Sequence, residues 1–258
     1  MTDRLEKIFP YLLIAPAVLP LVYVSGLVFP YISVKIFLLW GFGIIATAIF
    51  VYLSLSGRQF YYQRLRRFIS WIPLALLIVE YIASYFGIDF YRSFWGLFER
   101  GDGLLTSTVI TAFFYLILIS ADRQLLERLV KLVVVIAGIV ASIAVLQWIT
   151  TTSGGRAWFL PPVTGRIGST FGNAAFLAGY LGMALFVALI VMRDSVGRWR
   201  RVCQTVVIVS LFAILFAATR GTILALLSAL LIALAYAAWK GESTIKKTAR
   251  YGLVALVV

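Results

Sequence analysis

The sequence predicts an all-α integral membrane protein, a polytopic helix bundle with eight complete membrane spans, a truncated ninth span and a cytoplasmic N-terminus. Three observations predict this fold class: the composition, the lengths of the apolar runs, and the distribution of Lys and Arg among the loops. Hydrophobic residues make up 62% and charged residues 13% of the 258 residues, and the mean hydropathy is +1.01. Soluble domains are about half apolar and about a quarter charged, so a bilayer is needed to cover this much apolar surface.

Each predicted span is an apolar run of roughly the length that a membrane requires. The hydrocarbon core of a bilayer is about 30 Å thick and is crossed by about 20 apolar residues in a helix. The eight runs are residues 8–29, 34–53, 68–86, 104–120, 129–149, 171–192, 203–218 and 222–239. The first run is too long for the core of a signal peptide, so we expect it to be a retained helix. Residues 1–258 are predicted to form a single multi-pass membrane domain.

Lys and Arg are concentrated in alternate loops. One set of loops, which includes the N-terminus, holds 17 of the 23 basic residues, and the other set holds 6. Because basic residues favour the cytoplasmic side, the first set is predicted to lie inside. The formal charge of +13 does not indicate nucleic acid, because the charges lie in short loops and not on a soluble basic face. The chain has no histidine, and its single cysteine, Cys203, excludes an internal disulfide.

The last apolar run, residues 251–258, is too short to cross a membrane. Its residues would cover roughly 12 Å of a hydrocarbon core of about 30 Å. A helix that ended there would leave carbonyl groups unpaired in hydrocarbon. We therefore expect the sequence to be a fragment that stops within its ninth span.

The external loop at residues 87–103 combines aromatic and charged side chains. The aromatic residues are typical of a belt at the level of the lipid headgroups. That interpretation leaves the dense charge unexplained: the loop holds Asp89, Arg92, Glu99, Arg100 and Asp102. Glu80, which lies well inside the preceding span, could pair with Arg92 or Arg100 or could carry a proton.

Residues 165–181 contain small residues at helical spacing and a polar helix start. Gly168 and Gly172 are four residues apart, which favours close helix packing. Alternatively, Ser169, Thr170 and Asn173 could begin a helix whose free amides and positive dipole bind an anion beside Arg166.

A tight external turn at residues 218–222 holds Arg220, which could contact a ligand or could extend out of the bilayer to solvent. This arginine is one of five on the side where positive charge is generally avoided: Arg92, Arg100, Arg156, Arg166 and Arg220. Guanidinium groups match phosphate oxygens in bidentate fashion. A membrane-embedded diphosphate ligand would account for all five.

Three segments resemble the O-antigen ligase and polymerase superfamily, in the same order and on the same side of the membrane. The superfamily shows an external Ser-x-x-Trp-Gly-x-x-Glu-Arg-x-x-Gly stretch, a Gly-Ser-Thr-Phe-Gly-Asn helix start and a Ser/Thr-Arg-Gly turn. The resemblance covers residues 85–240. The residues that carry it are Ser93, Phe94, Trp95, Gly96, Glu99, Arg100 and Gly103, with one residue in place of two between the Ser and the Trp, then residues 168–173 with Ala178, Tyr180 and Leu181, then Thr219, Arg220 and Gly221.

The resemblance implies a glycosyltransferase of the cytoplasmic (inner) membrane. Such an enzyme takes a glycan from undecaprenyl diphosphate on the outer face and joins it to an acceptor glycan, lipid or protein, as a ligase, a polymerase or a protein O-oligosaccharyltransferase. By this analogy the diphosphate-binding residues are Arg166, Arg220, Arg100, Arg92, Asn173 and Ser169, and no metal or cofactor is needed. The catalytic base of the ligase branch lies in a large external loop after the next span, beyond Val258. We therefore expect the present chain to be inactive alone.

Two other classes of protein remain open. A transporter or flippase segment for an anionic lipid-linked substrate would place ionisable groups near the midplane on broken helices, whereas only Glu80 lies well inside a span here. A structural membrane subunit is favoured if the external arginines prove to be paired internally or solvated.

Overall fold

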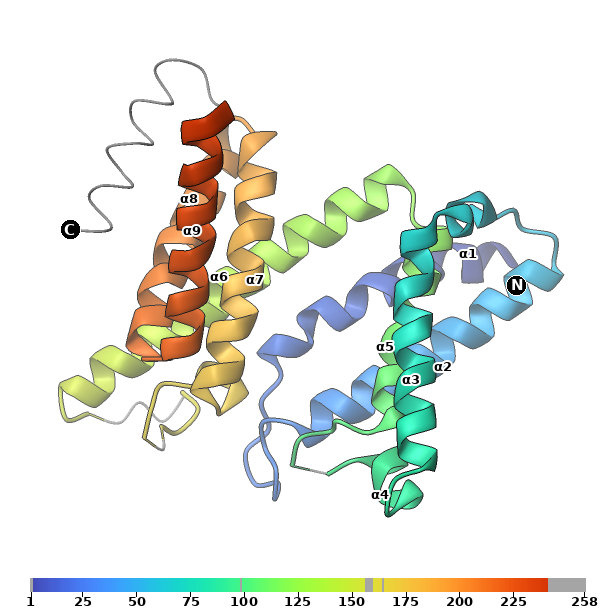
Figure 1. Ribbon diagram of the computed structural model, residues 1–258, viewed down its shortest axis with the longest axis horizontal. Helices are drawn as coiled ribbons and strands as arrows, with labels where there is room; N and C mark the ends of the chain where they lie inside the picture. Colours follow the sequence, from blue (N-terminus) through green and yellow to red (C-terminus); the bar gives the residue numbers. More distant parts are fainter. Residues whose placement is uncertain (1, 98, 156–159, 164, 241–258) are drawn as a thin grey trace.

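The computed structural model describes residues 2–97, 99–155, 160–163 and 165–240, and every regular element in those ranges is helical. The α-helices are α1 (Thr2–Ile14), α2 (Ser33–Leu55), α3 (Ile72–Tyr85), α4 (Phe90–Trp95), α5 (Leu104–Ser120), α6 (Arg123–Thr152), α7 (Ala174–Arg193), α8 (Gly197–Phe216) and α9 (Arg220–Lys240). The 3₁₀ helices are η1 (Ala15–Leu21), η2 (Tyr62–Arg66), η3 (Phe68–Trp71) and η4 (Ser169–Phe171). Figure 1 shows their arrangement.

Within the described residues, six helices are long and apolar enough to cross a membrane: Ser33–Leu55, Phe68–Tyr85, Arg123–Thr152, Ala174–Arg193, Gly197–Phe216 and Arg220–Lys240. The prediction of a helical membrane bundle is therefore confirmed. The run predicted at residues 104–120 forms α5, whose length is 17 residues. At about 1.5 Å per residue α5 covers about 25 Å, slightly less than a hydrocarbon core of about 30 Å.

The first apolar segment differs from the continuous helix predicted over residues 8–29. The α-helix ends at Ile14, and the chain continues as η1 only to Leu21. Pro16 and Pro20 lie in η1 and lack the N–H group that an α-helical turn requires. The chain then turns back through Gly26, whose φ is +87°. The predicted ninth span, residues 251–258, lies outside the described residues.

Two apolar clusters form the interior, and α6 connects them. The first cluster joins α1, α2 and α5 through residues such as Phe9, Leu53 and Phe113. The second joins α6, α7 and α8, and it begins at Val134 on α6. Leu125, near the start of α6, belongs to the first cluster. One 30-residue helix therefore contributes to both clusters.

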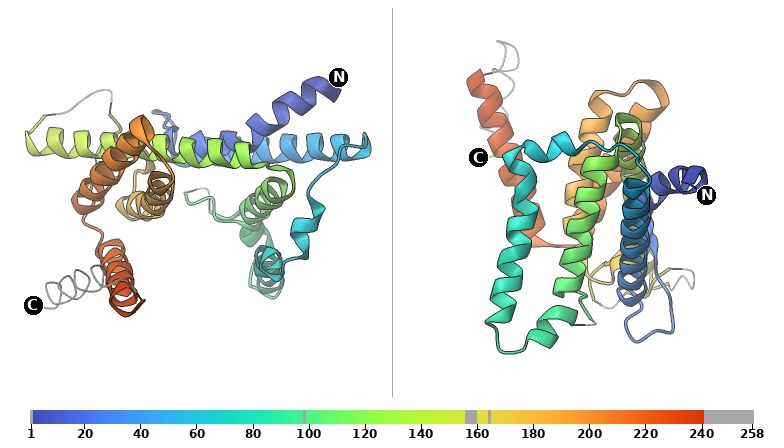
Figure 2. Two further views of the ribbon diagram at one scale, coloured as in Figure 1. Left: turned by 90° about the horizontal axis from the view of Figure 1, so that it is seen from above. Right: turned by 90° about the vertical axis from the view of Figure 1, so that its right-hand side faces the viewer.

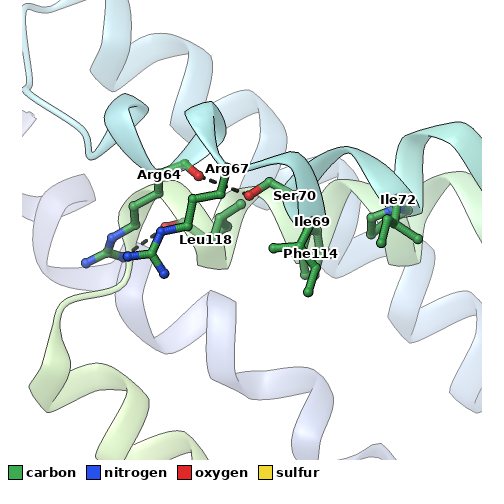
Figure 3. A pocket seen from close by; sticks show the side chains of 8 residues that line it. Arg64, Arg67, Ile69, Ser70, Ile72, Phe114 and Leu118 are labelled. Atoms are coloured by element: carbon green, nitrogen blue, oxygen red, sulfur yellow. Dashed lines mark hydrogen bonds between the residues drawn. The ribbon is translucent and has the colours of Figure 1, made fainter.

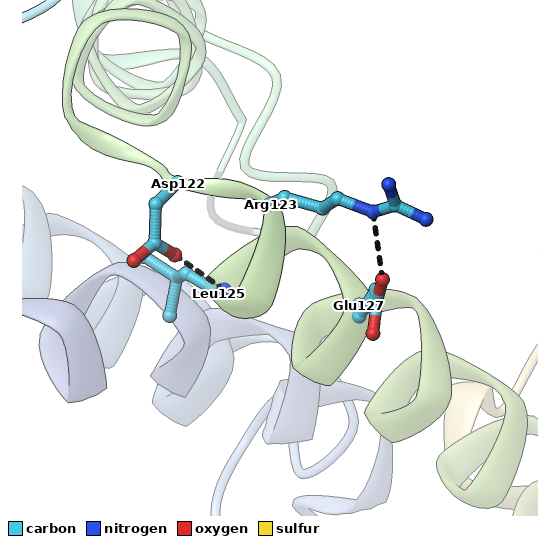
Figure 4. A network of polar contacts seen from close by, with 4 residues as sticks. All are labelled: Asp122, Arg123, Leu125 and Glu127. Carbon is cyan, nitrogen blue, oxygen red and sulfur yellow. Dashed lines mark hydrogen bonds and ion pairs between the residues drawn. The ribbon is translucent and has the colours of Figure 1, made fainter.

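The start of α6 is well defined. Asp122 Oδ1 accepts a hydrogen bond from the backbone N–H of Leu125 at 2.7 Å, which makes Asp122 the N-cap. Arg123 and Glu127 form an ion pair at 3.1 Å along the exposed face (Figure 4). The cap lies where the chain leaves α5, so it sets the point at which α6 crosses between the two clusters.

The outermost helices are α3 and α9. Seen from above, α2 and α6 lie along one side of the molecule, and α3 and α9 lie farthest from them (Figure 2). Neither α3 nor α9 has a buried residue, which is the pattern of helices that face lipid.

The loops gather at two opposite ends of the bundle (Figure 1). We call one the basic end; it holds residues 56–71, 121–122 and 194–196. The opposite end holds residues 22–32, 86–97, 99–103, 153–155, 160–163, 165–173 and 217–219. The N-terminus lies near the basic end, because Thr2 Oγ1 and the Tyr52 hydroxyl near the end of α2 are 3.4 Å apart.

Candidate substrate-binding site at the opposite end

The turn that precedes α7 is held against α6 by a buried glutamine. Gln147 is 1% exposed, and its Nε2 donates to the Pro161 carbonyl at 2.7 Å while its Oε1 accepts from the Ser169 N–H at 2.8 Å. The Ser169 hydroxyl donates to the Val140 carbonyl at 2.8 Å. Both donors of Ser169 are therefore used inside the protein, and this predicted ligand residue anchors the turn. Sequence reasoning missed Gln147, although a lone amide in an apolar span is a signal that it has a partner.

Asn173 begins α7, as the polar helix start predicted. Its Oδ1 accepts from the backbone N–H of Ala175 at 2.8 Å, which is the usual bond of an N-cap. Gly168 lies directly under this cap, because a Cβ atom added to Gly168 would lie 2.8 Å from the Asn173 nitrogen. The polar helix start is therefore present, whereas Gly168 and Gly172 flank η4 before α7 begins and do not pack one helix against another as predicted.

Arg166 connects this segment to the turn between α8 and α9. Its Nη1 donates to the Ala218 carbonyl at 3.3 Å, and Arg220 follows two residues later as the first residue of α9. Both arginines are exposed. No carboxylate of the described residues lies within ion-pair distance of either one. The fold therefore places two arginines without acidic partners on adjoining segments.

The segment that precedes α7 and the turn between α8 and α9 both contain strained backbone. Ser169 has a φ of 50° and Ala218 a φ of 49°, and they are the two non-glycine residues with positive φ in the described ranges. Such a conformation costs about 1–2 kcal/mol for a residue with a Cβ atom. Strain of this kind is concentrated at ligand sites, where the surrounding structure maintains it.

Thr219 adds an unsatisfied polar group beside Arg220. Its side chain is buried, and its hydroxyl has no hydrogen-bond partner among the residues that the structure describes. A buried polar group without a partner costs about 1–3 kcal/mol, so such groups usually meet a water or a ligand.

The segment before and at the start of α2 contacts the same turn, and sequence reasoning missed this role. Lys35 Nζ donates to the Thr170 carbonyl at 2.7 Å and lies 4.6 Å from the centre of the Phe171 ring. The Tyr31 hydroxyl donates to the Pro162 carbonyl at 2.9 Å. Burial and the neighbouring Tyr23 raise the pKa of Tyr31, so the hydroxyl stays protonated and remains a donor. The only sign of this contact in the sequence was Lys35, a basic residue at the start of an apolar run on the side with few basic residues.

The described loop residues between α3 and α5 line a separate groove together with the ends of those two helices. Asp89 caps the short helix α4 by accepting from the Arg92 N–H at 3.0 Å. Arg92 lines a groove of about 840 Å³ together with the carboxylates of Glu80, Asp89 and Asp102. No ion pair joins Glu80 to an arginine within the described residues, so the suggested pairing of Glu80 with Arg92 or Arg100 is absent.

The six predicted binding residues therefore fall into two groups. Arg166, Ser169, Asn173 and Arg220 gather around the starts of α7 and α9, whereas Arg92 and Arg100 lie in the loop carrying α4, which contacts α3 and α5. The start of α2 touches both groups. Ile36 lies against Gly101, since a Cβ atom added to that glycine would collide with the Ile36 side chain. Lys35 donates a hydrogen bond to the Thr170 carbonyl. Arg156, the fifth external arginine, lies outside the described residues.

Comparison with protein-family models, with curated proteins and with solved structures finds no match to this chain.

The end of the bundle opposite the basic end offers hydrogen-bond donors and fixed positive charge to a ligand. Arginine is always protonated and presents five N–H donors in a planar fork, which suits phosphate oxygens. Across the described ranges, no group of three His, Cys, Asp or Glu residues is arranged to hold a metal ion.

Proposed function

We propose that this protein binds a glycan linked to undecaprenyl diphosphate and is part of a membrane glycosyltransferase of the O-antigen ligase type. Arg166 and Arg220 hold the diphosphate. The proposal rests on one observation: the Arg166–Ala218 hydrogen bond brings together two segments that each carry an exposed arginine without an acidic partner. The resemblance of the same two segments to the superfamily motifs supports the choice of ligand.

The proposed topology has eight spans and a cytoplasmic N-terminus. It adds α5 and the first apolar segment to the six helices that meet the length and hydropathy of a span. The loops predicted to lie inside carry 17 of the 23 basic residues, which by the positive-inside rule places the basic end in the cytoplasm. The arginine pair then faces the outer surface of the cytoplasmic membrane.

In the proposed reaction the two guanidinium groups stabilise charge on the departing diphosphate. Negative charge grows on the bridging oxygen as its bond to the sugar breaks, and donors already aimed at that position lower the barrier. The Thr219 hydroxyl, which directly precedes Arg220 in the chain and has no hydrogen-bond partner among the described residues, is proposed to donate to the same group. An acceptor hydroxyl on a glycan, a lipid or a protein forms the new bond to the sugar as the bond to the diphosphate breaks, and the proton that it loses is balanced by the released undecaprenyl diphosphate. The choice of acceptor distinguishes a ligase from a polymerase or a protein oligosaccharyltransferase.

Arg92 and Arg100 are proposed to meet the glycan. The groove that Arg92 lines also presents Glu80, Asp89 and Asp102. Carboxylates accept hydrogen bonds from sugar hydroxyls and guanidinium groups donate to them, whereas carboxylates repel a diphosphate.

The test is to replace Arg166 or Arg220 with Ala in the full-length protein, expressed in cells that make the lipid-linked glycan. We expect each substitution to lower glycan transfer by about 100-fold, the size of effect seen when a charge-stabilising donor is removed. Arg200→Ala is the matched control, because Arg200 is also exposed but belongs to α8 near the basic end. Arg220→Lys separates charge from geometry, because lysine keeps the charge without the bidentate fork.

The purified variants are then titrated with undecaprenyl diphosphate, and binding is measured by native mass spectrometry. Transfer and binding equal to those of the unsubstituted protein in both Arg166→Ala and Arg220→Ala would disprove the assignment.

The same protein in liposomes is assayed for movement of a fluorescent lipid diphosphate across the bilayer. Movement without transfer would instead favour a translocator, a class for which the broken first segment is typical.

A further inference from the structure

A groove at the basic end, between α3 and α5, combines apolar walls with arginines. Its volume is about 550 Å³, which lies within the range of about 300–1,000 Å³ that ligand pockets occupy. It is lined by Arg64, Arg67, Ile69, Ser70, Ile72, Pro73, Phe114 and Leu118. Figure 3 shows both guanidinium groups at the same end of the groove, beside Leu118 and away from Ile69, Phe114 and Ile72.

Hydrogen bonds within the protein hold Arg64 in place. Its Nη1 donates to the carbonyls of Leu118 and Ala121 at 2.8 Å and 2.7 Å, at the end of α5. Its guanidinium carbon lies 4.2 Å from the centre of the Tyr61 ring. One guanidinium nitrogen is therefore occupied, and the rest of the group is presented in a fixed orientation.

Neither arginine has an acidic partner. No carboxylate in the described ranges lies within ion-pair distance of Arg64 or Arg67, and no hydrogen bond to a described residue occupies the Arg67 side chain. Two neighbouring guanidinium groups repel each other, and an anion between them removes that repulsion. The charge of the groove therefore calls for an anionic ligand.

The walls indicate an amphipathic ligand. Ile69 is 69% exposed, Ile72 43% and Phe114 40%, and all three lie on helices of the membrane bundle. A soluble anion would leave these side chains uncovered, whereas a phospholipid places its phosphate on the arginines and an acyl chain along the apolar walls. Basic pockets between membrane helices bind anionic headgroups in this way.

A second groove, between α6 and α8, is less well organised. Arg198 and Arg201 line it beside Val135 and Ile139, but no hydrogen bond among the described residues orients either guanidinium group. The groove between α3 and α5 is therefore the stronger candidate.

We infer that the groove between α3 and α5 is a binding site for one anionic phospholipid of the bilayer, with its phosphate on Arg64 and Arg67. This site is independent of the proposed glycan transfer and lies at the other end of the bundle. A lipid here would also cover the outer helix α3, which has no buried residue of its own.

The test compares Arg67→Gln with Arg66→Gln in the purified full chain. The two arginines are adjacent and both exposed, and each substitution removes one positive charge, but only Arg67 lines the groove. Each protein is titrated with phosphatidylglycerol or phosphatidylcholine, and the bound lipids are counted by native mass spectrometry. We expect Arg67→Gln to weaken binding of one phosphatidylglycerol by about 10-fold, as for loss of a charge-assisted contact, and Arg66→Gln to change it by less than about 2-fold.

Ile69→Glu provides a second variant, because it puts a negative charge on an exposed groove wall without touching the arginines. It is expected to weaken the same phosphatidylglycerol by about 10-fold. Equal effects of Arg66→Gln and Arg67→Gln, or equal affinity for phosphatidylcholine, would overturn the proposal. Inorganic phosphate and chloride are compared as competitors for phosphatidylglycerol at equal ionic strength. Stronger competition by phosphate would show that the site takes free phosphate and not a lipid.

Discussion

The individual residues with the clearest roles lie where the chain passes through left-handed backbone. Ser169 and Ala218 adopt positive φ values in the two segments that Arg166 connects. Ser169 is held in that conformation by the hydrogen bonds that it donates to Gln147 Oε1 and to the Val140 carbonyl. The strain is therefore maintained by the packing of α6 and is located next to the candidate ligand-binding arginines.

Gly172 gives a prediction at this scale. Its φ is +66°, and an added Cβ atom would lie 2.5 Å from the Tyr31 ring. Gly172→Ala is expected to cost about 1–2 kcal/mol from the backbone and about 1–3 kcal/mol from overpacking, so the melting temperature in detergent should fall.

Gly179→Ala is the matched control, because Gly179 lies in α7 with open space around its Cα atom. Thermal unfolding followed by circular dichroism measures both variants. In a Tyr31→Ala background, Gly172→Ala should lower the melting temperature less than it does in the unsubstituted protein, because only the backbone part of the loss remains. Equal melting temperatures for Gly172→Ala and Gly179→Ala would contradict the described turn.

At the scale of elements, glycines in three helices let neighbouring helices approach closely. Gly43 on α2 lies against Val109 of α5, Gly138 on α6 lies against Val206 of α8, and Gly182 on α7 lies near Thr222 of α9. Small residues perform this function in membrane helices, where packing contributes most of the association. The contact at Gly138 matters most for the site, because α6 carries both Gln147 and Val140.

Gly138→Leu tests that contact. A Cβ atom at position 138 would already lie 2.8 Å from the Val206 side chain, so a leucine must push α8 away from α6. We expect a loss of about 1–3 kcal/mol and a lower melting temperature in detergent.

Gly41→Leu is the control for this change, since Gly41 lies in α2 with nothing near its Cα atom, and it should be tolerated. Val206→Ala in the Gly138→Leu background should restore part of the stability. An unchanged melting temperature for Gly138→Leu would mean that α6 and α8 are farther apart than described.

At the scale of the whole molecule, the loops alternate between two ends, and α6 connects two apolar clusters. The candidate diphosphate site belongs to the cluster of α6, α7 and α8, and the candidate lipid site lies beside the cluster of α1, α2 and α5. The two sites lie at opposite ends, so a substitution at one should leave binding at the other unchanged.

The proposed topology predicts which loop positions are accessible from outside the cell. In a Cys203→Ala background, Ser25→Cys and Ser153→Cys at the opposite end should react with a membrane-impermeant maleimide on intact cells. Gln63→Cys and Asp194→Cys at the basic end should react only after permeabilisation. All four positions are exposed, so a difference in labelling reports the side of the membrane and not burial.

Labelling of Gln63→Cys and Asp194→Cys from outside, with Ser25→Cys and Ser153→Cys protected, would reverse the proposed orientation. Labelling of Ser25→Cys and Gln63→Cys from the same side would instead remove a span between them and change the count of eight.

The sequence by itself determined that the protein is a helical membrane bundle and where most helices lie. Hydropathy is sufficient for this because a helix in hydrocarbon must satisfy its hydrogen bonds internally, so each span is a local property. The helix predicted at residues 104–120 has the bounds of α5, and the run predicted at 171–192 falls close to α7, Ala174–Arg193. The Asn173 cap was also visible as a local pattern.

Only the tertiary structure decided which of the candidate residues meet. Arg166 and Ala218 are separated by 52 positions, and Lys35 and Thr170 by 135, so no local pattern could pair them. Ser169 was predicted as a ligand donor, and the structure uses its N–H and hydroxyl groups to anchor a turn. The division of the arginines between two loops likewise follows from the packing of separate helix groups, because side chains distant in sequence are brought together only by the way the helices cross.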